Sequence, residues 1–372
     1  MKTAAALSTD HEHSVPFFWP FAAALALGEQ AVGTMQRNFD FAVEAGRIEH
    51  PPQPEWASGN TVRLDLATMR LRAFAQGPTS ATPVLIDAPY AGHSATIADY
   101  AKGQSLVQAL MENGLANVFV TDWKPATLEM RYFDIDTYLE QLNVAIDDLG
   151  GQVHLVGLCQ GGWLSTMLAA RFSGKVKSLT LAGSPIDTDA GEGPIKRLAH
   201  AMPMSIYEEM VGAGGGNMPG RFMLTGWKNM HPDKQYVKRF EALYRNVEDR
   251  NYVERTEKFA SWYENPLDLP GRFYLQAISQ LFKENRLAKG AFTALGRTLD
   301  LKDVKVPAYL LAGEDDDITT SQQVFRARDL FGTDPGQVVT RLVPGGHIGL
   351  FMGRKTLADA WPDIAKWILA LG

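Results

Sequence analysis

Short apolar runs recur along the chain between residues 84 and 343, and most are separated by stretches with helical spacing. They fall at residues 84–86, 118–120, 153–156, 179–181, 309–311 and 338–343. Such runs are typical of strands buried on both faces, as in a parallel sheet covered by helices. Upstream, residues 61–66 and 69–74 alternate apolar and polar positions around a short turn, which predicts an antiparallel pair at the sheet edge. The expected fold class is therefore α/β with a mostly parallel central sheet.

The same pattern divides the chain into four segments. Residues 1–58 are predicted to be an N-terminal helical segment that ends in a Pro-rich linker, because its prolines prevent a continuous helix. Residues 59–187 form the first part of the α/β core, and residues 301–372 form its last part. Between them, residues 188–300 are helical in pattern, rich in aromatic residues and too long for an ordinary connection. We expect this insertion to be a helical cap or lid.

Composition narrows the classes of function. The 372 residues include 36 basic and 42 acidic side chains, a net charge of -6, without a long run of like charge, which disfavours a nucleic-acid partner. The single cysteine, Cys159, excludes an intramolecular disulfide and points to a reducing compartment. No apolar run is long enough to predict a transmembrane segment. We therefore expect a cytoplasmic protein that acts on a neutral or small-molecule substrate.

The clearest chemical motif lies where an apolar strand meets a helical stretch. Residues 153–156 lead directly into Gly157-Leu158-Cys159-Gln160-Gly161-Gly162. A sharp strand-to-helix turn with glycines two positions before and after its central residue is a nucleophile elbow. Cys159 occupies the nucleophile position, where the positive end of the following helix favours a thiolate. The alternative is a small buried hydrophobic residue, but the spacing after a clear strand favours the nucleophile.

A nucleophile in such an elbow is served by an acid and a histidine that follow it in the chain. His347 comes directly after the strand predicted at 338–343 and is the predicted general base. Three adjacent aspartates, Asp315, Asp316 and Asp317, follow the strand predicted at 309–311. Asp316 is preferred as the triad acid, while the other two are expected to cap a helix or face water. Spacing alone leaves the three aspartates open.

Acyl transfer also needs donors for the oxyanion. The backbone N–H of Gln160, directly after the nucleophile, is the first expected donor, and Tyr90 or Ala91 in the loop after an early strand supplies the second. His93, in the same loop, either contacts substrate or ties down the loop, and both readings stay open. No metal site is predicted, and this chemistry needs no cofactor.

In these motifs the chain resembles the intracellular polyhydroxyalkanoate (PHB) depolymerases, which are related to the polyhydroxyalkanoate synthases. The resemblance covers residues 84–369 and rests on these pieces: Asp87-Ala88-Pro89-Tyr90-Ala91-Gly92-His93, Val120-Thr121-Asp122-Trp123, Gly183-Ser184-Pro185-Ile186-Asp187-Thr188, Phe273-Tyr274-Leu275-Gln276, and Gly313-Glu314 with Asp316-Asp317-Ile318. It implies an α/β-hydrolase fold with a helical cap and a triad of Cys159, Asp316 and His347. It also implies hydrolysis of ester bonds in intracellular polyhydroxyalkanoate.

Two features are closer to the synthases, namely the pair Gly161-Gly162 and the run at residues 345–349. The alternative is therefore a synthase-like acyltransferase that uses hydroxyacyl-CoA. The lid and acid-loop pieces match the depolymerases better, so we expect hydrolysis first. An alternative of another class is a non-catalytic granule-binding protein. The expected partner is a polyester granule or a hydroxyacyl ester, with a second copy of the chain as a candidate for a homodimer.

Four aromatic residues near the N-terminus bear on the granule. Phe17, Phe18, Trp19 and Phe21 precede the Pro-rich linker. One interpretation is that they pack on the domain, because large exposed apolar clusters are rare on monomeric proteins. The other is that they form an exposed binding surface for an apolar granule. The sequence leaves both interpretations open.

Overall fold

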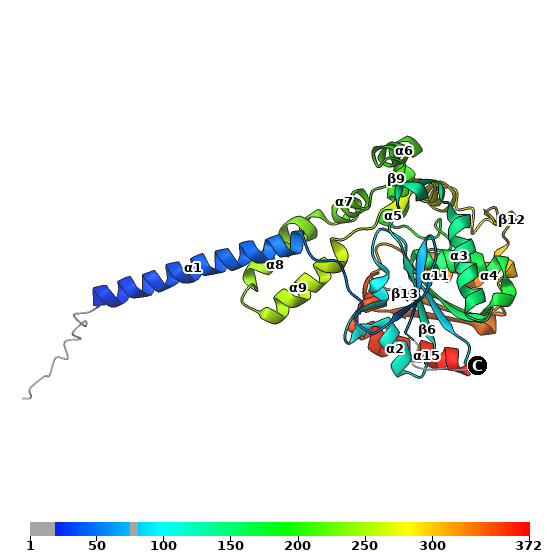
Figure 1. Ribbon diagram of the computed structural model, residues 1–372, viewed down its shortest axis with the longest axis horizontal. Coiled ribbons are helices and arrows are strands. Elements are labelled where there is room, and N and C mark those ends of the chain that lie inside the picture. Colours follow the sequence, from blue (N-terminus) through cyan, green and yellow to red (C-terminus); the bar gives the residue numbers. More distant parts are fainter. Residues whose placement is uncertain (1–18, 75–80) are drawn as a thin grey trace, which may run out of the picture.

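The computed structural model describes residues 19–74 and 81–372, with side chains described from residue 33 onward. An eight-stranded sheet with the order β1-β2-β6-β3-β7-β8-β13-β14 lies at its centre (Figure 1). The strands are β1 (Thr61–Asp65), β2 (Met69–Ala73), β3 (Val84–Asp87), β6 (Val118–Trp123), β7 (Val153–Leu158), β8 (Val176–Ala182), β13 (Ala308–Gly313) and β14 (Val338–Val343). β2 is antiparallel to β1 and β6, and the remaining pairs are parallel. The predicted edge pair and the mostly parallel sheet are thus confirmed.

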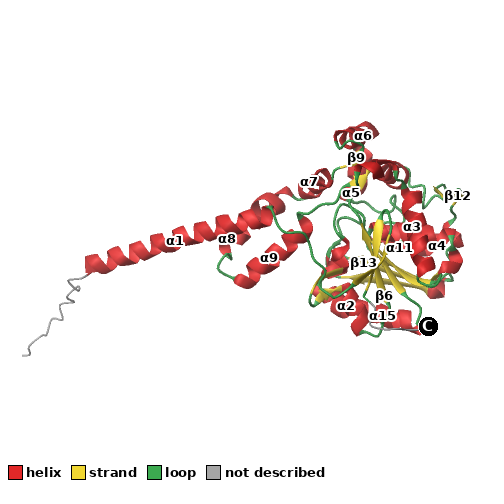
Figure 2. Cartoon of the chain, viewed as in Figure 1, coloured by secondary structure: helices red, strands yellow, loops and turns green. Residues whose placement is uncertain are grey.

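Helices cover both faces of this sheet (Figure 2). On one face, α3 (Ile135–Asp148) and α4 (Gln160–Arg171) share a hydrophobic core with Leu155 of β7. On the other face, α2 (Leu106–Glu112) and α15 (Trp361–Ala370) share a second core with Val156. Neighbouring residues of one strand therefore enter different cores, which explains why the strands read as unbroken apolar runs.

Short elements complete the α/β core. They are η1 (Ala95–Ala98), β4 (Asp99–Ala101), β5 (Gln104–Ser105), η2 (Leu128–Tyr132), η3 (Ser173–Lys175), β11 (Thr293–Ala294), β12 (Arg297–Thr298), η6 (Leu301–Asp303), α11 (Ser321–Phe325), α12 (Ala327–Leu330), η7 (Pro335–Gln337), α13 (Gly349–Met352) and α14 (Arg354–Asp359).

The insertion between β8 and β13 is largely helical. It contains α5 (Pro194–Ala201), α6 (Met204–Ala213), β9 (Asn217–Met218), α7 (Gly220–Met230), η4 (Asp233–Lys238), α8 (Arg239–Arg245), α9 (Arg250–Tyr263), β10 (Leu269–Pro270), α10 (Gly271–Gln276) and η5 (Ala277–Lys283). In the following sections it is called the lid.

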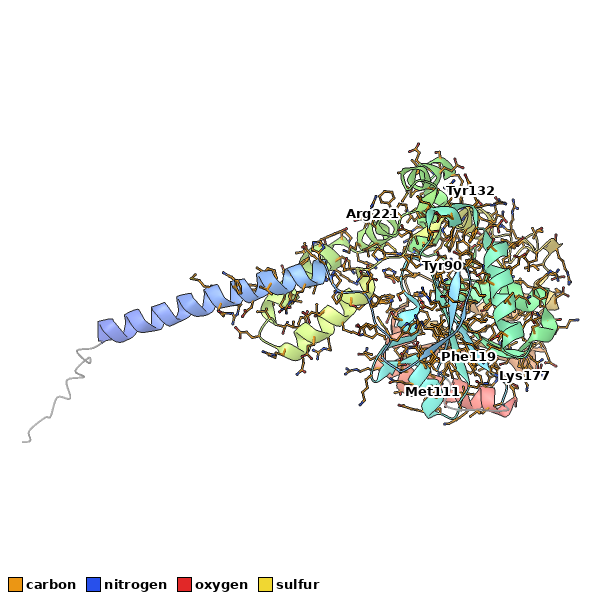
Figure 3. The ribbon with its side chains drawn as sticks, in the orientation of Figure 1. Tyr90, Met111, Phe119, Tyr132, Lys177 and Arg221 are labelled. Atoms are coloured by element: carbon orange, nitrogen blue, oxygen red, sulfur yellow. The ribbon has the colours of Figure 1, made fainter. Side chains whose placement is uncertain are left out.

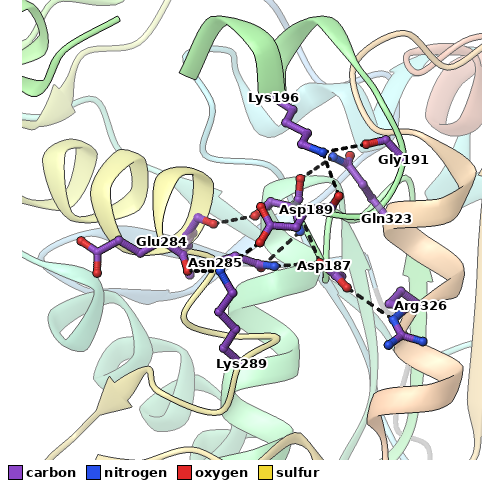
Figure 4. A network of polar contacts seen from close by, with 11 residues as sticks. Asp187, Asp189, Gly191, Lys196, Glu284, Asn285, Lys289, Gln323 and Arg326 are labelled. Carbon is purple, nitrogen blue, oxygen red and sulfur yellow. Dashed lines mark hydrogen bonds and ion pairs between the residues drawn. The ribbon is translucent and has the colours of Figure 1, made fainter. Parts of the chain in front are cut away.

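A polar network holds the two ends of the lid against the core (Figure 4). Asp187, directly after β8, accepts a hydrogen bond from the side-chain amide of Asn285 at 2.7 Å and lies 3.4 Å from the Arg326 guanidinium. Asp189 forms an ion pair with Lys289 at 3.0 Å, and its carbonyl accepts from Lys196. The points where the chain enters and leaves the lid are therefore fixed to each other.

Helix α1 (Trp19–Glu49) extends away from the α/β core beside α8 and α9 (Figure 1). Its C-terminal part packs on the lid through Ile48, which joins Leu243 and Val253 in a small hydrophobic cluster. Phe17 and Phe18 lie outside the described residues, and so do the side chains of Trp19 and Phe21, so the two interpretations of that cluster stay predictions. Among the described residues, no helix combines the length and apolar character needed to cross a membrane.

Candidate active site

Cys159 sits in a tight turn between β7 and α4. Its backbone has φ 50° and ψ -116°, a left-handed conformation that is strained for any residue other than glycine. The turn is held from both sides, because the Cys159 N–H donates to Ala182 O and Cys159 O accepts from Gly162 N–H. Its glycines are required by close approach: a Cβ atom on Gly161 would lie 2.1 Å from Asp87 O. The predicted elbow geometry is thus present at this position.

The thiol of Cys159 lies at the N-terminus of the 12-residue helix α4 and is partly exposed. The unpaired N–H groups and the dipole of that helix end favour negative charge. A partly exposed thiol at a helix N-terminus is a setting typical of nucleophilic cysteines.

His347 and Asp316 meet in the interior, at the carboxyl ends of β14 and β13. The Nδ1 atom of His347 lies 2.7 Å from Oδ2 of Asp316, and both residues are buried. The other carboxylate oxygen of Asp316 accepts the backbone N–H groups of Ile318 at 3.0 Å and Thr319 at 2.8 Å. These hydrogen bonds fix the position of the Asp316 carboxylate. The carboxylate in turn orients the imidazole through Nδ1, which leaves Nε2 to exchange protons with the nucleophile.

The pKa of His347 depends on the charges of its neighbours Cys159 and Asp316. Burial lowers the pKa of His347, but the charges of Cys159 and Asp316 and the hydrogen bonds to both outweigh burial and raise this pKa to about 10. An imidazole with that pKa keeps its proton at neutral pH when a thiolate lies beside it. The arrangement can therefore hold a thiolate–imidazolium pair, the reactive form of a cysteine nucleophile.

The two aspartates next to Asp316 have other surroundings. Asp315 is exposed. Asp317 is partly exposed and pairs with His231 at the end of α7, with 2.5 Å between Oδ2 and Nε2. Only Asp316 of the three contacts His347 among the described residues. The His231–Asp317 pair joins the lid to the acid loop, and sequence reasoning missed it because no local pattern links residues 86 positions apart.

The expected oxyanion donors differ in their surroundings. Gln160 and Ala91 both line a cavity that Cys159 also lines. The side chain of Tyr90 instead turns into the core (Figure 3), where its ring stacks on Tyr138 with 5.0 Å between centroids. The lining places Gln160 and Ala91 beside the nucleophile, and the backbone N–H groups of Gln160 and of Tyr90 or Ala91 stay the predicted oxyanion donors.

His93 performs a structural task and also faces the site. Its Nε2 lies 3.1 Å from the carbonyl oxygen of Tyr263 on α9 of the lid. Its ring stacks against both Trp262 and Tyr263, with centroid distances of 4.7 Å and 5.2 Å. Burial lowers its pKa to about 4, so the ring is neutral near pH 7. His93 thus ties the oxyanion loop to the lid while it lines a cavity with Cys159.

Two cavities meet at Cys159. The first, of about 340 Å³, has polar residues such as His231 and Asp317 together with aromatic rings of α9 in its wall. The second, of about 510 Å³, lies under the lid and is lined almost entirely by apolar side chains, including those of α5, α6, α7 and α10. Ala91, Trp227, Met230 and Ile318 line both cavities. A substrate could therefore reach the thiol from two directions.

The fold and the site can now be compared with known proteins. Residues 183–371, a little more than half of the chain, match the family described as "PHB de-polymerase C-terminus". The chain belongs to this family. The matched region contains the whole lid, Asp316 and His347, whereas Cys159 precedes it.

Relatives of this family member are named polymerases. The poly(3-hydroxyalkanoate) polymerase subunit PhaC of Haloferax mediterranei is 29% identical over 290 residues, which cover 76% of this chain and 56% of that relative. Subunit PhaC of Allochromatium vinosum is 23% identical over 307 residues, which cover 79% of this chain and 82% of that relative. The chain thus spans little more than half the length of the Haloferax protein.

Solved structures agree on the fold. Mouse alpha/beta hydrolase domain-containing protein 10 superposes with a TM-score of 0.50 at 15% identity, covering 85% of this chain and 100% of the mouse chain. At that identity the likeness concerns the fold alone. It confirms the expected α/β-hydrolase fold for this member of the depolymerase C-terminus family.

Proposed function

We propose that this chain is a polyhydroxyalkanoate synthase-like acyltransferase that joins 3-hydroxyacyl units from a thioester carrier into a polyester. The observation that carries the proposal is the Cys159–His347–Asp316 arrangement at the meeting point of two cavities. The names of the relatives support synthesis over the hydrolysis that the sequence favoured. In this proposal Cys159 is the nucleophile, His347 the general acid–base, and Asp316 the residue that orients the imidazole.

In the first half-reaction the acyl group moves from the carrier to the enzyme. The proton of Cys159 resides on His347, and the thiolate attacks the carbonyl carbon of the thioester. Backbone N–H groups of Gln160 and Ala91 donate to the oxyanion that forms. The carbon–sulfur bond to the carrier then breaks, and the carrier thiolate leaves with the proton from His347. An acyl thioester on Cys159 remains, and His347 is neutral.

In the second half-reaction a hydroxyl group accepts the acyl unit. His347 removes the proton from the terminal hydroxyl of a growing chain, and the hydroxyl oxygen attacks the acyl carbon on Cys159. The new ester bond forms as the Cys159 thiolate departs, so the thiolate–imidazolium pair is restored. The polyester lengthens by one unit without any net change in the enzyme.

The second cavity supports an apolar acyl substrate. Apart from a few polar atoms its wall consists of aliphatic, methionine and aromatic side chains, among them Met210, Phe222 and Phe282. Removal of apolar surface from water contributes about 25 cal/mol per Å², so a polyester segment would gain affinity there. An apolar wall on this side of Cys159 would also slow hydrolysis of the acyl-enzyme, because it disfavours water there.

Hydrolysis is the second candidate function. It shares the triad and the acyl-enzyme, and it differs in that water takes the place of the chain hydroxyl. The description of the family as a PHB de-polymerase region and the sequence similarities of the acid loop favour it. A non-catalytic granule-binding protein is less well supported, because it would have no use for an oriented His347–Asp316 pair. Association with granules, homodimer formation and a cytoplasmic location stay predictions.

One experiment separates these functions. Purified protein is incubated separately with 3-hydroxybutyryl-CoA and with amorphous poly-3-hydroxybutyrate, and free CoA, polymer mass and free hydroxy acid are measured. Synthesis predicts stoichiometric CoA release with polymer growth, and hydrolysis predicts hydroxy acid from the polymer alone. Cys159→Ala should lose either activity. Inertness of the wild type on both substrates would contradict the two enzymatic functions.

A further inference from the structure

A third hollow on the lid lies beside the active-site cavities. It is an open groove of about 360 Å³ between η4, the start of α8 and α9. Its lining consists of Lys234, Gln235, Arg239, Tyr252, Arg255, Thr256 and Phe259. Three of these seven side chains are cationic and none is acidic, so the groove has a positive potential.

The charges of the groove are unevenly compensated. Arg239 is largely buried and forms an ion pair with Glu264, which also pairs with Lys228 at 2.6 Å. For Lys234 and Arg255, by contrast, no ion pair is found within the described residues. Both are exposed. The two remain available to an anionic ligand, and the guanidinium of Arg255 can bind phosphate through two parallel hydrogen bonds.

The groove shares part of its wall with the cavity of the nucleophile. Gln235 and Phe259 line both the groove and the first cavity, which Cys159 and His347 also line. The ring of Phe259 stacks on Tyr263 with 5.3 Å between centroids, and Tyr263 belongs to that first cavity. A single extended ligand could therefore place one end at Cys159 and the other among the cations.

The local backbone is unusual at this position. Lys234 and Gln235 belong to η4 (Asp233–Lys238), a π-helical segment between α7 and α8. Such segments are rare and occur frequently at functional sites, because they redirect side chains that an α-helix would place elsewhere. Here the segment begins shortly after His231, which lines the first cavity, and it carries Lys234 into the groove.

We infer that this groove binds the phosphorylated nucleotide of a coenzyme A thioester whose acyl end lies at Cys159. The inference rests on the proposed function and names how its carrier is held. Lys234 and Arg255 contact the phosphate groups, while the rings of Tyr252 and Phe259 offer faces on which an adenine base can stack. The repeating ester units of a polyester are neutral and do not need these cations, so the groove favours a carrier that bears phosphate groups over the polymer chain.

The test compares a thioester that carries the nucleotide with one that lacks it. Initial rates are measured with 3-hydroxybutyryl-CoA and with 3-hydroxybutyryl-N-acetylcysteamine, which shares the acyl group and the thioester. The variant is Lys234→Gln/Arg255→Gln. The matched control is Lys238→Gln/Arg250→Gln, which removes two cations from η4 and α9 that lie outside the groove. Binding of 3′,5′-ADP is measured by calorimetry on the same proteins.

The ratio of kcat/KM for the CoA thioester to that for the short thioester should fall about tenfold or more in the groove variant, as expected for lost bonds to charged groups. The control should keep the wild-type ratio, and 3′,5′-ADP should bind about tenfold more weakly to the groove variant alone. An unchanged ratio or unchanged 3′,5′-ADP binding in the groove variant would overturn the inference. If the wild type uses neither thioester, the proposed function fails, and the calorimetric binding of 3′,5′-ADP tests the groove separately. Binding that depends on Lys234 and Arg255 would support the groove as a nucleotide site. Absence of binding would refute it.

Discussion

The Nδ1 atom of His347 lies 2.7 Å from Oδ2 of Asp316, although the two residues are 31 positions apart in the sequence. The sheet brings them together, because β13 and β14 are parallel neighbours that pair up to Gly313 and Val343. Beyond these strand ends the two loops remain joined, since the Asp315 N–H donates to Gly345 O at 3.1 Å. The dyad is thus a direct consequence of strand order.

The first prediction concerns which aspartate serves His347. Asp316→Asn should lower kcat by about 10⁴-fold. The N–H groups of Ile318 and Thr319 would hold the amide oxygen, so the amide NH2 would face Nδ1 and favour the wrong tautomer of the imidazole. Asp315→Asn, at an exposed position, and Asp317→Asn, which alters a partly exposed pair with His231, should change kcat much less. Steady-state kinetics on all three variants check this order. A larger loss at Asp315 or Asp317 would move the triad acid.

The second prediction concerns the charge on His347. Its pKa of about 10 depends on Cys159, since burial acts in the opposite direction. Cys159→Ala removes the neighbouring negative charge, so the pKa of His347 should fall, while Asp316 continues to raise it. Nitrogen NMR of labelled histidine over pH 5 to 11 measures the change. An equal pKa in the wild type and the variant would exclude a thiolate–imidazolium pair.

Local patterns explain why the strands, the elbow and His347 were predictable from the sequence. Each depends on residues close together in the chain, such as the glycines around Cys159 or the apolar runs of β7 and β14. The order of the chain then implied that the acid and the histidine follow the nucleophile. These positions follow from short-range rules, and the pairing of β13 with β14 then brings Asp316 and His347 together.

Other features depend on packing between distant segments and could not be predicted. The pair of His231 and Asp317 joins the lid to the core across 86 positions, and Tyr90 turns into the core because Trp123, Tyr138 and Phe273 surround its ring. The cavities and the groove depend on the placement of lid helices whose sequence pattern gives no orientation. In the proposed reaction the choice between water and a chain hydroxyl as acceptor depends on the shape and hydration of these spaces. The sequence favoured hydrolysis only through the resemblance of its lid and acid-loop pieces to the depolymerases.

The third prediction tests the packing behind the elbow. A Cβ atom on Gly162 would lie 1.8 Å from Oγ and 2.3 Å from Cβ of Ser184. Gly162→Ala should therefore lower the free energy of unfolding by about 1–3 kcal/mol or more, as for an overpacked core. Ser184→Gly in the same chain removes both clashing atoms and should restore much of the loss. Urea unfolding measures the three proteins.

A matched substitution shows whether that rescue is specific. Gly161→Ala would place its Cβ 2.1 Å from the backbone oxygen of Asp87, which no side-chain change can remove. Ser184→Gly should therefore leave the Gly161→Ala variant as unstable as before. Equal rescue of both variants would mean that Ser184→Gly stabilises the fold in general and does not relieve a clash.

The fourth prediction concerns Asp87, a fully buried carboxyl group beneath the oxyanion loop. Ser165 Oγ donates to it at 3.0 Å and Thr121 Oγ1 lies 3.3 Å away. Burial outweighs these hydrogen bonds and raises its pKa to about 8. The folded chain keeps a proton that the unfolded chain loses near pH 4, so wild-type stability should fall as pH rises from about 4 to about 8.

Substitution isolates this contribution. Asp87→Asn cannot ionise, so the variant should gain at least about 1 kcal/mol relative to the wild type between pH 5 and pH 8.5. Unfolding free energies from urea titrations at the two pH values provide the measurement. A constant difference between the two proteins across this range would show that Asp87 has the same protonation state in the folded and unfolded chains.

The last prediction concerns acid lability at the joint between the oxyanion loop and the lid. Burial lowers the pKa of His93 to about 4, whereas an unfolded histidine titrates near 6.5. As pH falls through this window the unfolded chain binds a proton that the folded chain refuses, so stability falls by up to about 3 kcal/mol. His93→Phe keeps a ring against Trp262 and Tyr263 but cannot be protonated, so its unfolding free energy should decline less between pH 6.5 and pH 4. His154, whose pKa burial also lowers to about 4, remains in the variant and should leave part of the slope. Identical slopes for the wild type and His93→Phe in urea titrations would contradict the prediction, because they would mean that His93 has the same pKa in the folded and unfolded chains.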